Sequence, residues 1–379
     1  MISIPKLKVM TIVGTRPEII RLSRPMALLD KYTQQIIVHT GQNYDYELNE
    51  VFWNDLEIRK PDHFLNVDVS SLGATVGDIM RKSEEVMLVE KPDAVLILGD
   101  TNSCLAAYIA KRLRIPIFHM EAGNRSFDFN VPEEINRRII DHIADFNLVY
   151  TEHARRHLIS EGLMHRRIYL TGSPMREVLI HYQLKIKNST ILETLQLNKN
   201  GYFVVSVHRE ENVDYADNFN NLLNSLNVVA EKFNKRVIVS THPRTRKKLE
   251  SLGPKEFNSK VEFMKPMGFF DYNKLQKDAY CVISDSGTIT EESSFLKFPA
   301  IMIRQAHERP EGMDVGLVVM SGLSPERVVD SINMMVSQFE KYKPLDVEDY
   351  SSDRVSDQVV KIIQSYTDYV NRVVWRKNI

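Results

Sequence analysis

Short apolar runs rich in β-branched residues recur along the chain, and segments of helical length separate them. This alternation predicts parallel strands joined by crossover helices, and therefore an α/β fold with doubly wound sheets. The runs with the length and composition of buried strands are residues 8–13, 35–40, 94–98, 116–120, 147–150, 168–171, 202–207, 237–241, 280–284 and 300–304.

A chain of 379 residues is too long for one ordinary core and suits two domains. The segment 172–200 is polar and lacks a strand pattern, so the boundary is expected there. We predict two Rossmann-like domains, residues 1–172 and 173–354, that face each other across a cleft. The C-terminal helix within residues 355–379 is expected to cross back onto the first domain.

Composition excludes several classes of partner. The net charge of −1 implies no general attraction to nucleic acid or to a membrane surface. The apolar runs are too short to span a bilayer. The first residues lack a signal-peptide pattern, so we expect a cytoplasmic protein. Cys104 and Cys281 have no metal-binding spacing and lie in apolar contexts, which predicts buried thiols and no metal site.

Polar residues follow most of the predicted strands. In doubly wound folds, ligands bind beyond the carboxyl ends of the strands, so these segments are where a site is expected. The segments are GTRPEII, TGQNYD, GDTNS and EAGNR in the first half, and VHREEN, THPRT and SDSGT in the second.

The SDSGT segment has the features of an anion site. Ser286, Gly287 and Thr288 lie between a predicted strand and a helix expected to begin near Thr290. Their N–H and hydroxyl groups would point at a bound diphosphate, and Glu292, one turn further on, could accept the hydroxyls of a ribose. A capping box is the alternative, but Ser-Gly-Thr is more than a cap requires.

Several basic residues follow other strands. Arg16 lies in a turn before a helix, which suits either an anion site or a capped surface turn. The absence of GxGxxG gives no support for a dinucleotide site. His208 and Arg209 directly follow a buried strand, and a ligand contact is favoured there over a histidine hydrogen-bonded within a loop. His242 and Arg309 occupy similar positions, although an exposed loop would look the same.

Carboxylates gather after two adjacent strands. Asp100 and Glu121 end these strands, where an ionised side chain is costly unless it is paired or used. Glu133 begins the helix that follows the next loop. We predict that Asp100, Glu121 and Glu133 act as acids and bases in one cleft. A surface ion pair with Arg138, four residues later on the helix, accounts for Glu134.

Taken together, the motifs resemble one known family. GTRPEII, TGQNYD, GDTNS, HMEAGNR, PEEINR, GSP, SVHREEN, THPR, SDSG, TEES and ERPE occur in this order over nearly the whole chain. The chain resembles the non-hydrolysing UDP-N-acetylglucosamine 2-epimerases. The resemblance implies a fold of the glycosyltransferase-B type, an isomerase that needs no cofactor, a UDP-sugar substrate and a homodimer.

The resemblance also implies a reaction and a set of site residues. UDP would leave C1 as C2 loses its proton, giving a glycal-type alkene to which UDP adds back after protonation of the other face. Asp100, Glu121, Glu133 and His208 are then catalytic. The expected substrate-binding residues are Arg16, Gln42, Arg209, His242, Ser286, Gly287, Thr288, Glu292 and Arg309.

The finer resemblance is to one branch of the family. The chain has EAGNRSFD where typical members have EAGLRT, TGQNYD for TGQH, GTITEES for GGIQEE, and Arg21 for a lysine. These features resemble the branch that converts UDP-2-acetamido-2,6-dideoxy-L-talose to UDP-N-acetyl-L-fucosamine for capsule or O-antigen synthesis. The alternatives are a UDP-N-acetylglucosamine 2-epimerase, which forms UDP-N-acetylmannosamine, and a glycosyltransferase of the same fold.

Many family members bind a second UDP-N-acetylglucosamine as an allosteric activator. The resemblance places Gly73 and Ala74 at the Arg-Gln pair that holds the activator, and Asp45 at a second glutamine of that site. We therefore expect no activation by UDP-N-acetylglucosamine.

Overall fold

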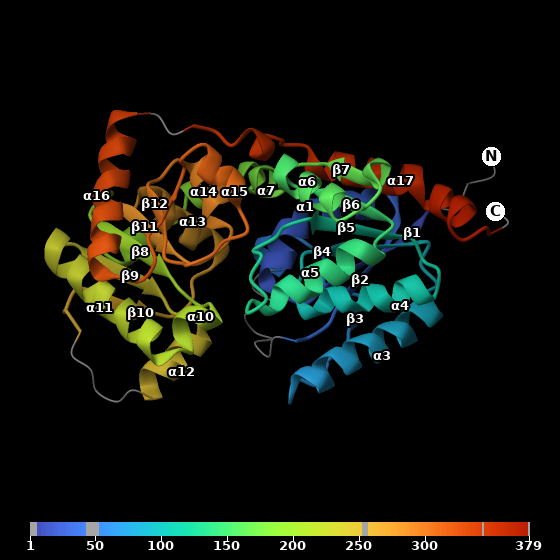
Figure 1. Ribbon diagram of the computed structural model, residues 1–379, viewed down its shortest axis with the longest axis horizontal. Coiled ribbons are helices and arrows are strands. Elements are labelled where there is room, and N and C mark those ends of the chain that lie inside the picture. Colours follow the sequence, from blue (N-terminus) through green and yellow to red (C-terminus); the bar gives the residue numbers. More distant parts are fainter. Residues whose placement is uncertain (1–5, 43–52, 252–256, 343–344, 378–379) are drawn as a thin grey trace. The chain divides into compact units, whose positions relative to one another are not determined.

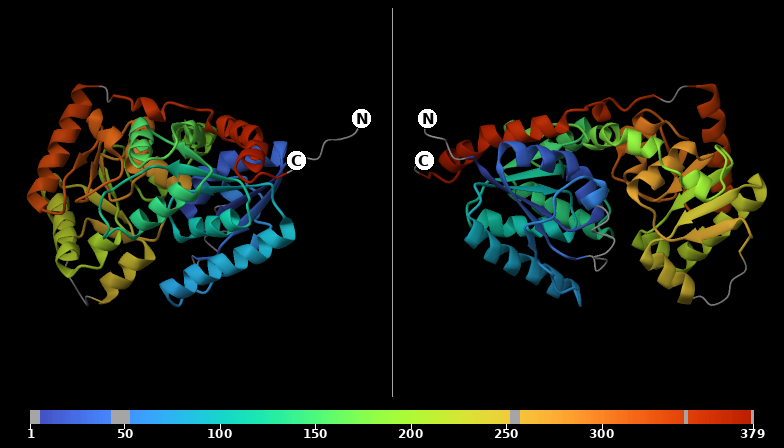
Figure 2. Two further views of the ribbon diagram at one scale, coloured as in Figure 1. Left: turned by 45° about the vertical axis from the view of Figure 1, so that its right-hand side comes forward. Right: turned by 180° about the vertical axis from the view of Figure 1, so that it is seen from behind.

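The computed structural model describes residues 6–42, 53–251, 257–342 and 345–377. The chain divides into two compact units: unit 1 comprises Met1–Val178 and Asp349–Ile379, and unit 2 comprises Leu179–Glu348. The chain leaves unit 1 within helix α7 (Met175–His181), a few residues later than the boundary predicted from sequence, and returns at the short helix η3 (Glu348–Tyr350). Figures 1 and 2 show the path of the chain.

Unit 1 is built on a parallel sheet. Ile12 in the central strand β1 lies beside Val38 of β2 and Ile97 of β4, and all of these side chains are buried. Such strands are apolar on both faces because helices cover both faces. Among the described residues the strand order is β3 (His63–Phe64), β2 (Gln34–His39), β1 (Lys8–Val13), β4 (Ala94–Leu98), β5 (Ile117–Ala122), β6 (Phe146–Val149) and β7 (Ile168–Leu170).

The helices of unit 1 lie on the two faces of this sheet (Figure 1). Helices α3, α4 and α5 contribute to the core on one face. On the other face, α1 packs against the C-terminal helix α17, and Tyr366 of α17 packs on Phe146 of β6. The helices are α1 (Arg16–Tyr32), α3 (Leu72–Glu90), η1 (Asn102–Leu105), α4 (Ala106–Arg112), α5 (Pro132–Ile143), α6 (Glu152–Ser160), η2 (His165–Arg167) and α17 (Val355–Val373).

Unit 2 repeats this architecture. Its core includes Val205 of β8 and Ile283 of β11, with Leu226 and Ile332 from the helices α11 and α16, which pack against each other. The strand order among the described residues is β10 (Val261–Met264), β9 (Arg236–Ser240), β8 (Tyr202–Ser206), β11 (Cys281–Ser284), β12 (Ala300–Met302) and β13 (Val319–Met320).

The helices of unit 2 connect these strands and include several short segments. They are α8 (Gln183–Lys187), α9 (Ile191–Thr194), α10 (Glu210–Val213), α11 (Ala216–Phe233), α12 (Pro243–Ser251), α13 (Phe269–Asp278), α14 (Ile289–Leu296), α15 (Pro310–Asp314) and α16 (Pro325–Lys341). Two parallel, doubly wound sheets confirm the α/β class predicted from sequence. Cys104 and Cys281 are free and buried, as predicted.

Each sheet has one point where the strand order reverses. In unit 1 the reversal lies between β1 and β4, and in unit 2 it lies between β8 and β11. The loops after the two flanking strands diverge at such a point and leave a crevice, where ligands of doubly wound folds bind. The topology therefore selects the loops that begin at Gly14 and Gly99 in unit 1, and at Val207 and Asp285 in unit 2.

Among the described residues, no helix combines the length and the apolar character needed to cross a lipid bilayer.

Candidate active site

At the reversal point of unit 1, a buried carboxylate joins two loops. Glu18, in the first turn of α1, accepts hydrogen bonds from the backbone N–H groups of Gly14 and Thr15 and from the hydroxyls of Thr101 and Ser103. Burial raises the pKa of Glu18 to about 7 even though these donors favour the ionised form. Glu18 thus ties the loop after β1 to the loop after β4. In sequence, Glu18 has the pattern of an ordinary residue in a first helical turn, and nothing there indicates this role.

The same crevice holds Gln42, one of the predicted binding residues. Its side-chain Nε2 donates to Thr101 Oγ1 at 3.2 Å. A β-carbon at Gly14 would lie 2.4 Å from this Nε2, so only glycine permits the approach. Arg16 is the first residue of α1 and is partly exposed beside this crevice. Arg16 and Gln42 therefore lie at the switch point, where the sequence analysis expected ligand contacts.

Asp100, in the loop after β4, and Glu121, near the end of β5, are both held by arginines. Asp100 Oδ2 lies 2.6 Å from Nη2 and 2.9 Å from Nε of Arg137. Glu121 forms an ion pair with Arg21 of α1. Asp100 keeps a 22% exposed side chain and Glu121 one of 9%, so both carboxylates are paired and retain contact with solvent.

The backbone at Glu121 departs from regular strand geometry. Its φ angle is 63°, and the pairing of β5 with β6 shifts register between Met120 and Ala122. A glutamate in this left-handed region is strained, and such strain is concentrated at functional sites. The irregularity turns the Glu121 side chain toward Arg21 and toward the amide of Asn124, which lies 3.4 Å away.

The two adjacent glutamates of α5, Glu133 and Glu134, have different surroundings in the structure. The expected ion pair of Glu134 with Arg138 is present. The expectation that it lies at the surface was wrong, because Glu134 is fully buried and also contacts Ser126 and Arg137. The first turn of α5 turns Glu134 inward, because the helix presses this face against the loop after β5. Glu133 is half-buried on the adjacent face of the helix.

At the reversal point of unit 2, Asp285 organises the loop after β8. This buried carboxylate accepts the backbone N–H groups of His208 at 3.0 Å and Arg209 at 2.9 Å, and the side-chain amide of Asn212 at 3.1 Å. The Nδ1 atom of His208 lies 3.3 Å from Asp285 Oδ1. Asp285 thus orients the imidazole, whose side chain is 41% exposed, and the sequence analysis had not assigned it a role.

Arg209 reaches across to the loop after β12. Its Nη2 lies 3.1 Å from Glu308 Oε1, and Glu308 is also bound by the buried Arg304 at 2.9 Å. A β-carbon at Gly287 would lie 2.6 Å from the same Glu308 oxygen, so the glycine leaves room for this pair. The loops that carry His208, Gly287 and Glu308 therefore meet at the switch point of unit 2.

The segment before α14 lacks the predicted alternative of a capping box. Thr288 is the N-cap residue, but its side chain makes no capping hydrogen bond and lies 2.9 Å from the hydroxyl of Ser286. Glu292 is buried in α14 and accepts a hydrogen bond from Gln276 at 2.7 Å. Ser286, Gly287 and Thr288 therefore remain candidates for binding an anion.

The two remaining basic residues have different settings. Arg309 is buried, and its Nη2 lies 3.6 Å from Glu291 Oε2 of α14. Arg209, whose side chain is 18% exposed, is therefore better placed than Arg309 to reach a ligand. His242, exposed after β9, has its ring 5.7 Å from that of His208. Among the described residues, no group of three His, Cys, Asp or Glu side chains could hold a metal ion.

Comparison with known proteins places these features in a family. A family model described as UDP-N-acetylglucosamine 2-epimerase matches residues 28–364. The chain belongs to the UDP-N-acetylglucosamine 2-epimerase family. It is an isomerase of this family, with the predicted fold of the glycosyltransferase-B type.

Individual relatives agree with this assignment. A solved UDP-N-acetylglucosamine 2-epimerase from Rickettsia bellii is 50% identical, with a TM-score of 0.90, and the match covers 98% of this chain and 100% of that one. The Methanocaldococcus jannaschii enzyme, solved in complex with UDP-GlcNAc and UDP, is 32% identical with a TM-score of 0.89 over 95% and 100% of the two chains. The UDP-N-acetylglucosamine 2-epimerase of Methanococcus maripaludis is 36% identical over 337 residues, 87% of this chain and 92% of its own.

These relatives bear on the substrate predicted for this epimerase. All three are named for UDP-N-acetylglucosamine, so they favour the alternative of the sequence analysis over the 6-deoxy-L-talose branch. Membership of an isomerase family also favours epimerisation over glycosyl transfer. Of the predicted allosteric positions, Gly73 and Ala74 lie in the first turn of α3, and Asp45 lies outside the described residues.

Proposed function

We propose that this epimerase inverts C2 of UDP-N-acetylglucosamine, forming UDP-N-acetylmannosamine, by eliminating UDP and adding it back. The observation that carries the proposal is the division of chemistry between the two switch points. The one in unit 1 holds partly exposed, arginine-paired carboxylates, and the one in unit 2 holds hydrogen-bond donors suited to a diphosphate.

The chemistry explains why carboxylates and anion-binding groups are both required. The hydrogen on C2 is not adjacent to a carbonyl, so direct deprotonation is too slow. Cleavage of the C1–O bond sends its electron pair to the diphosphate and gives C1 cationic character. Loss of the C2 proton to a carboxylate then forms the C1=C2 double bond. Protonation of the opposite face and return of UDP to C1 complete the inversion.

In unit 2, the proposed role is to hold UDP. Arg209 and the N–H and hydroxyl groups of Ser286, Gly287 and Thr288 would stabilise the negative charge that develops on the leaving diphosphate. The imidazole of His208, fixed by Asp285, is placed beside them. Glu292 is proposed to accept the ribose hydroxyls. Arg309 supports α14 through Glu291.

In unit 1, the proposed role is proton transfer. Two groups must remove and return the proton on opposite faces of C2, and Asp100, Glu121 and Glu133 are the candidates. The pairing of Asp100 and Glu121 with arginines holds both carboxyl groups in defined orientations. Arg16 and Gln42, at the same crevice, are proposed to contact the substrate.

One observation keeps a second substrate in consideration. Both Arg21 and Asn124, two of the residues that depart from the usual family sequence, contact Glu121. These changes therefore alter the surroundings of a proposed catalytic carboxylate. UDP-2-acetamido-2,6-dideoxy-L-talose, which would give UDP-N-acetyl-L-fucosamine for a capsule or O-antigen, is the second candidate.

Reaction in D2O tests the proposal. The purified protein is incubated separately with each nucleotide sugar, without NAD and in the presence of EDTA, and the products are analysed by NMR and mass spectrometry. We expect UDP-N-acetylmannosamine carrying deuterium at C2. An epimerised product with protium at C2 would count against elimination. Exclusive turnover of the 6-deoxy sugar would reverse the order of the two substrates.

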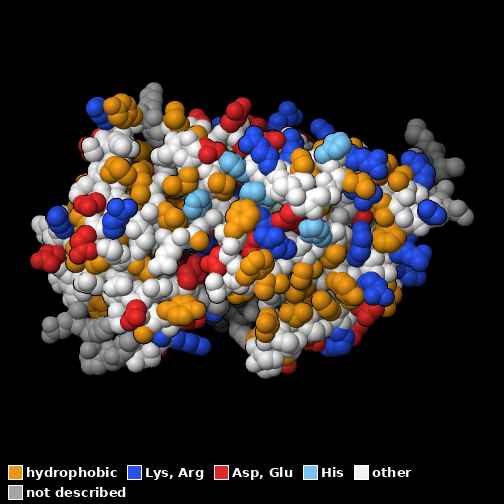
Figure 3. Space-filling view, in the orientation of Figure 1, with side chains coloured by type: hydrophobic (Ala, Val, Ile, Leu, Met, Phe, Trp, Pro, Cys, Tyr) orange, Lys and Arg blue, Asp and Glu red, His pale blue; other side chains and the backbone are white. Residues whose placement is uncertain are grey.

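We also propose that the protein is a homodimer, as its family resemblance implies. Phe127, Phe129, Ile135 and Ile139 are exposed on α5 and the loop before it, and Figure 3 shows hydrophobic side chains gathered over this helix. Covering such side chains favours self-association. Light scattering after size exclusion tests this proposal. We expect twice the chain mass for the wild type, and a monomer at all concentrations would reject the dimer.

A further inference from the structure

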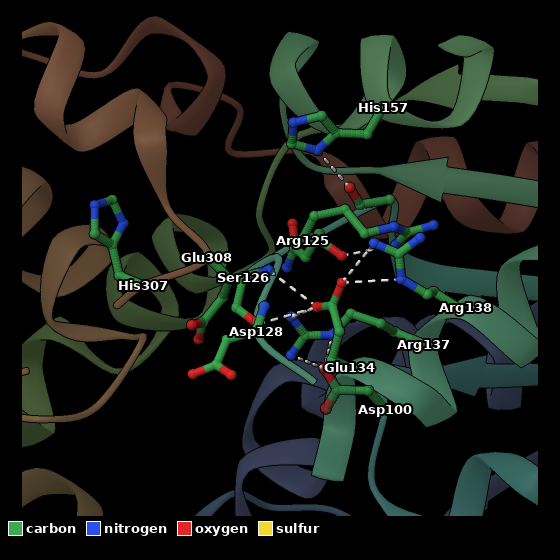
Figure 4. Close-up of polar contacts among 12 residues, drawn as sticks. Asp100, Arg125, Ser126, Asp128, Glu134, Arg137, Arg138, His157, His307 and Glu308 are labelled. Atoms are coloured by element: carbon green, nitrogen blue, oxygen red, sulfur yellow. Dashed lines mark hydrogen bonds and ion pairs between the residues drawn. The ribbon is translucent and has the colours of Figure 1, made fainter. Parts of the chain in front are cut away.

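Glu134 occupies an unusual position for a residue next to a proposed catalytic glutamate. Its carboxylate is fully buried. Oε2 accepts the backbone N–H of Ser126 at 3.0 Å and lies 3.2 Å from Nη1 of Arg137, and Oε1 lies 2.9 Å from Nη2 of Arg138. Figure 4 shows these contacts and the adjoining pair of Arg137 with Asp100.

The guanidinium of Arg137 connects the two carboxylates. Nη1 faces Glu134, while Nε and Nη2 face Asp100 at 2.9 and 2.6 Å. A guanidinium is planar and its N–H donors form a rigid fork. A contact at Nη1 therefore fixes the direction in which Nε and Nη2 point.

We propose that Glu134 is a positioning residue, which holds Arg137 in the orientation that aligns the carboxylate of Asp100. This inference rests on the proposed function, in which Asp100 moves a proton at C2. Glu134 itself does not touch substrate, because its carboxylate is enclosed by protein. Its effect on the reaction passes through Arg137.

The surrounding charges support a role beyond neutralising arginine. Arg138 already has a second carboxylate, since its Nη1 lies 3.1 Å from Glu161 Oε1. Glu161 is in turn bound by Arg125 at 2.6 Å. Charge balance at Arg138 therefore does not depend on Glu134 alone, whereas the contact of Glu134 with Arg137 lies next to Asp100.

The loop of Asp100 has an independent attachment to α5. The side-chain amide of Asn136 donates to the backbone carbonyl of Asp100 at 2.9 Å. Loss of the Glu134 carboxylate should therefore leave the backbone of Asp100 in place. It should disturb mainly the orientation of the Arg137 and Asp100 side chains. This separates an effect on turnover from an effect on the fold of the loop.

The test compares Glu134→Gln and Glu134→Asp with Glu161→Gln. Glu161 is the matched control because it also binds Arg138, and among the described residues it contacts Arg125 and His142 but not Arg137. For Glu134→Gln we expect kcat to fall by about 10²-fold with KM changed by less than about 3-fold, since the reacting groups are misaligned but UDP binding is kept. The aspartate keeps the charge at a shorter reach, and we expect a fall of about 10-fold.

A double-mutant cycle identifies the route of the effect. If Glu134 acts through Arg137 on Asp100, Glu134→Gln added to Asp100→Asn should lower the residual rate by less than about 3-fold. Slow incorporation of deuterium at C2 gives the rate of these variants, and thermal midpoints show that they are folded. We expect Glu161→Gln to keep kcat within about 3-fold of the wild type.

Each outcome is decisive. A folded Glu134→Gln variant with wild-type kcat, an equal loss in Glu161→Gln, or full additivity with Asp100→Asn would overturn the positioning role. Should Glu134→Gln not fold, a folded Glu134→Asp variant with wild-type kcat would overturn it equally. If the wild type incorporates no deuterium at C2, the proposed function itself fails, and the role of Asp100 fails with it.

Discussion

Asp285 holds His208 at two points: it accepts the backbone N–H of His208 at 3.0 Å and lies 3.3 Å from the ring Nδ1. The carboxylate is buried at the switch point of unit 2, so its orientation is fixed by the protein and not by solvent. A ring held in this way presents its other nitrogen in a defined direction, which is the requirement for a group that acts on a leaving diphosphate.

Replacing Asp285 by asparagine should damage both stability and turnover. The amide has one accepting oxygen, and its NH2 group would face N–H donors that now contact a carboxylate. We expect a loss of about 2 kcal/mol in the free energy of unfolding, as for other buried groups left without an acceptor. Turnover should fall by at least about 10²-fold through the misplaced His208. Urea unfolding and steady-state kinetics measure both; a stable variant of normal kcat would contradict the role given to Asp285.

The amide variants of the proposed proton-transfer residues should separate catalysis from folding. We expect Asp100→Asn, Glu121→Gln and Glu133→Gln each to lower kcat by more than about 10²-fold. Asp100→Asn and Glu121→Gln also remove ion pairs with Arg137 and Arg21, so their thermal midpoints should fall. Among the described residues, the side chain of Glu133 has no hydrogen-bond or ion-pair partner, so its variant should keep the wild-type midpoint. A fully active Glu133→Gln variant would remove Glu133 from the mechanism.

The raised pKa of Glu18 predicts that the free energy of unfolding depends on pH. Burial raises its pKa in the folded protein from the ordinary 4.5 to about 7, so the folded state binds a proton that the unfolded state has released between these values. Stability contributed by the protonated side chain is therefore full below pH 4.5 and is lost as the pH rises to about 7. Glu18→Gln lacks this titration. The wild type should thus lose roughly 3 kcal/mol relative to the variant over this window.

Urea unfolding of both proteins at intervals from pH 5 to about 8 tests this difference, since the window is set by the two pKa values. Parallel pH profiles for the wild type and Glu18→Gln would show that Glu18 does not titrate there.

The allosteric prediction concerns kinetics. The family resemblance places Gly73 and Ala74, in the first turn of α3, where an activator-binding Arg-Gln pair is expected, and neither side chain carries a charge or an amide. We expect UDP-N-acetylmannosamine to be converted without added UDP-N-acetylglucosamine, with a hyperbolic dependence of rate on substrate. A lag that added UDP-N-acetylglucosamine abolishes, or a sigmoidal curve, would show that activation exists.

The sequence predicted the central strands of both sheets but missed three of the strands at their edges. Central strands such as β1 and β4 are buried on both faces, so their β-branched runs were visible. The missed strands β3, β10 and β13 lie at sheet edges, where most of the side chains are only half-buried. β3 and β13 are only two residues long, and a glutamate interrupts β10, so these strands lack the long apolar run on which the prediction depended.

The same limit applies to the site. Asp100, Glu121 and His208 could be proposed from sequence because they lie at the ends of recognisable strands, and the strand-end rule needs only sequence. Glu18 looks like an ordinary residue of a first helical turn, and the structure shows its contacts with Thr101 and Ser103, more than 80 residues away. The burial of Glu134 depends on how α5 packs against the loop at Ser126, which the helical period alone does not specify.

Unit 1 consists of two separate stretches of chain, with unit 2 between them. During synthesis on the ribosome, the sequence of unit 2 is made before the stretch that begins at Asp349. Until α17 is made, the face of α1 that packs against it stays uncovered. Unit 1 can therefore complete its fold only after the whole of unit 2 has been synthesised, because α17 covers a face of α1.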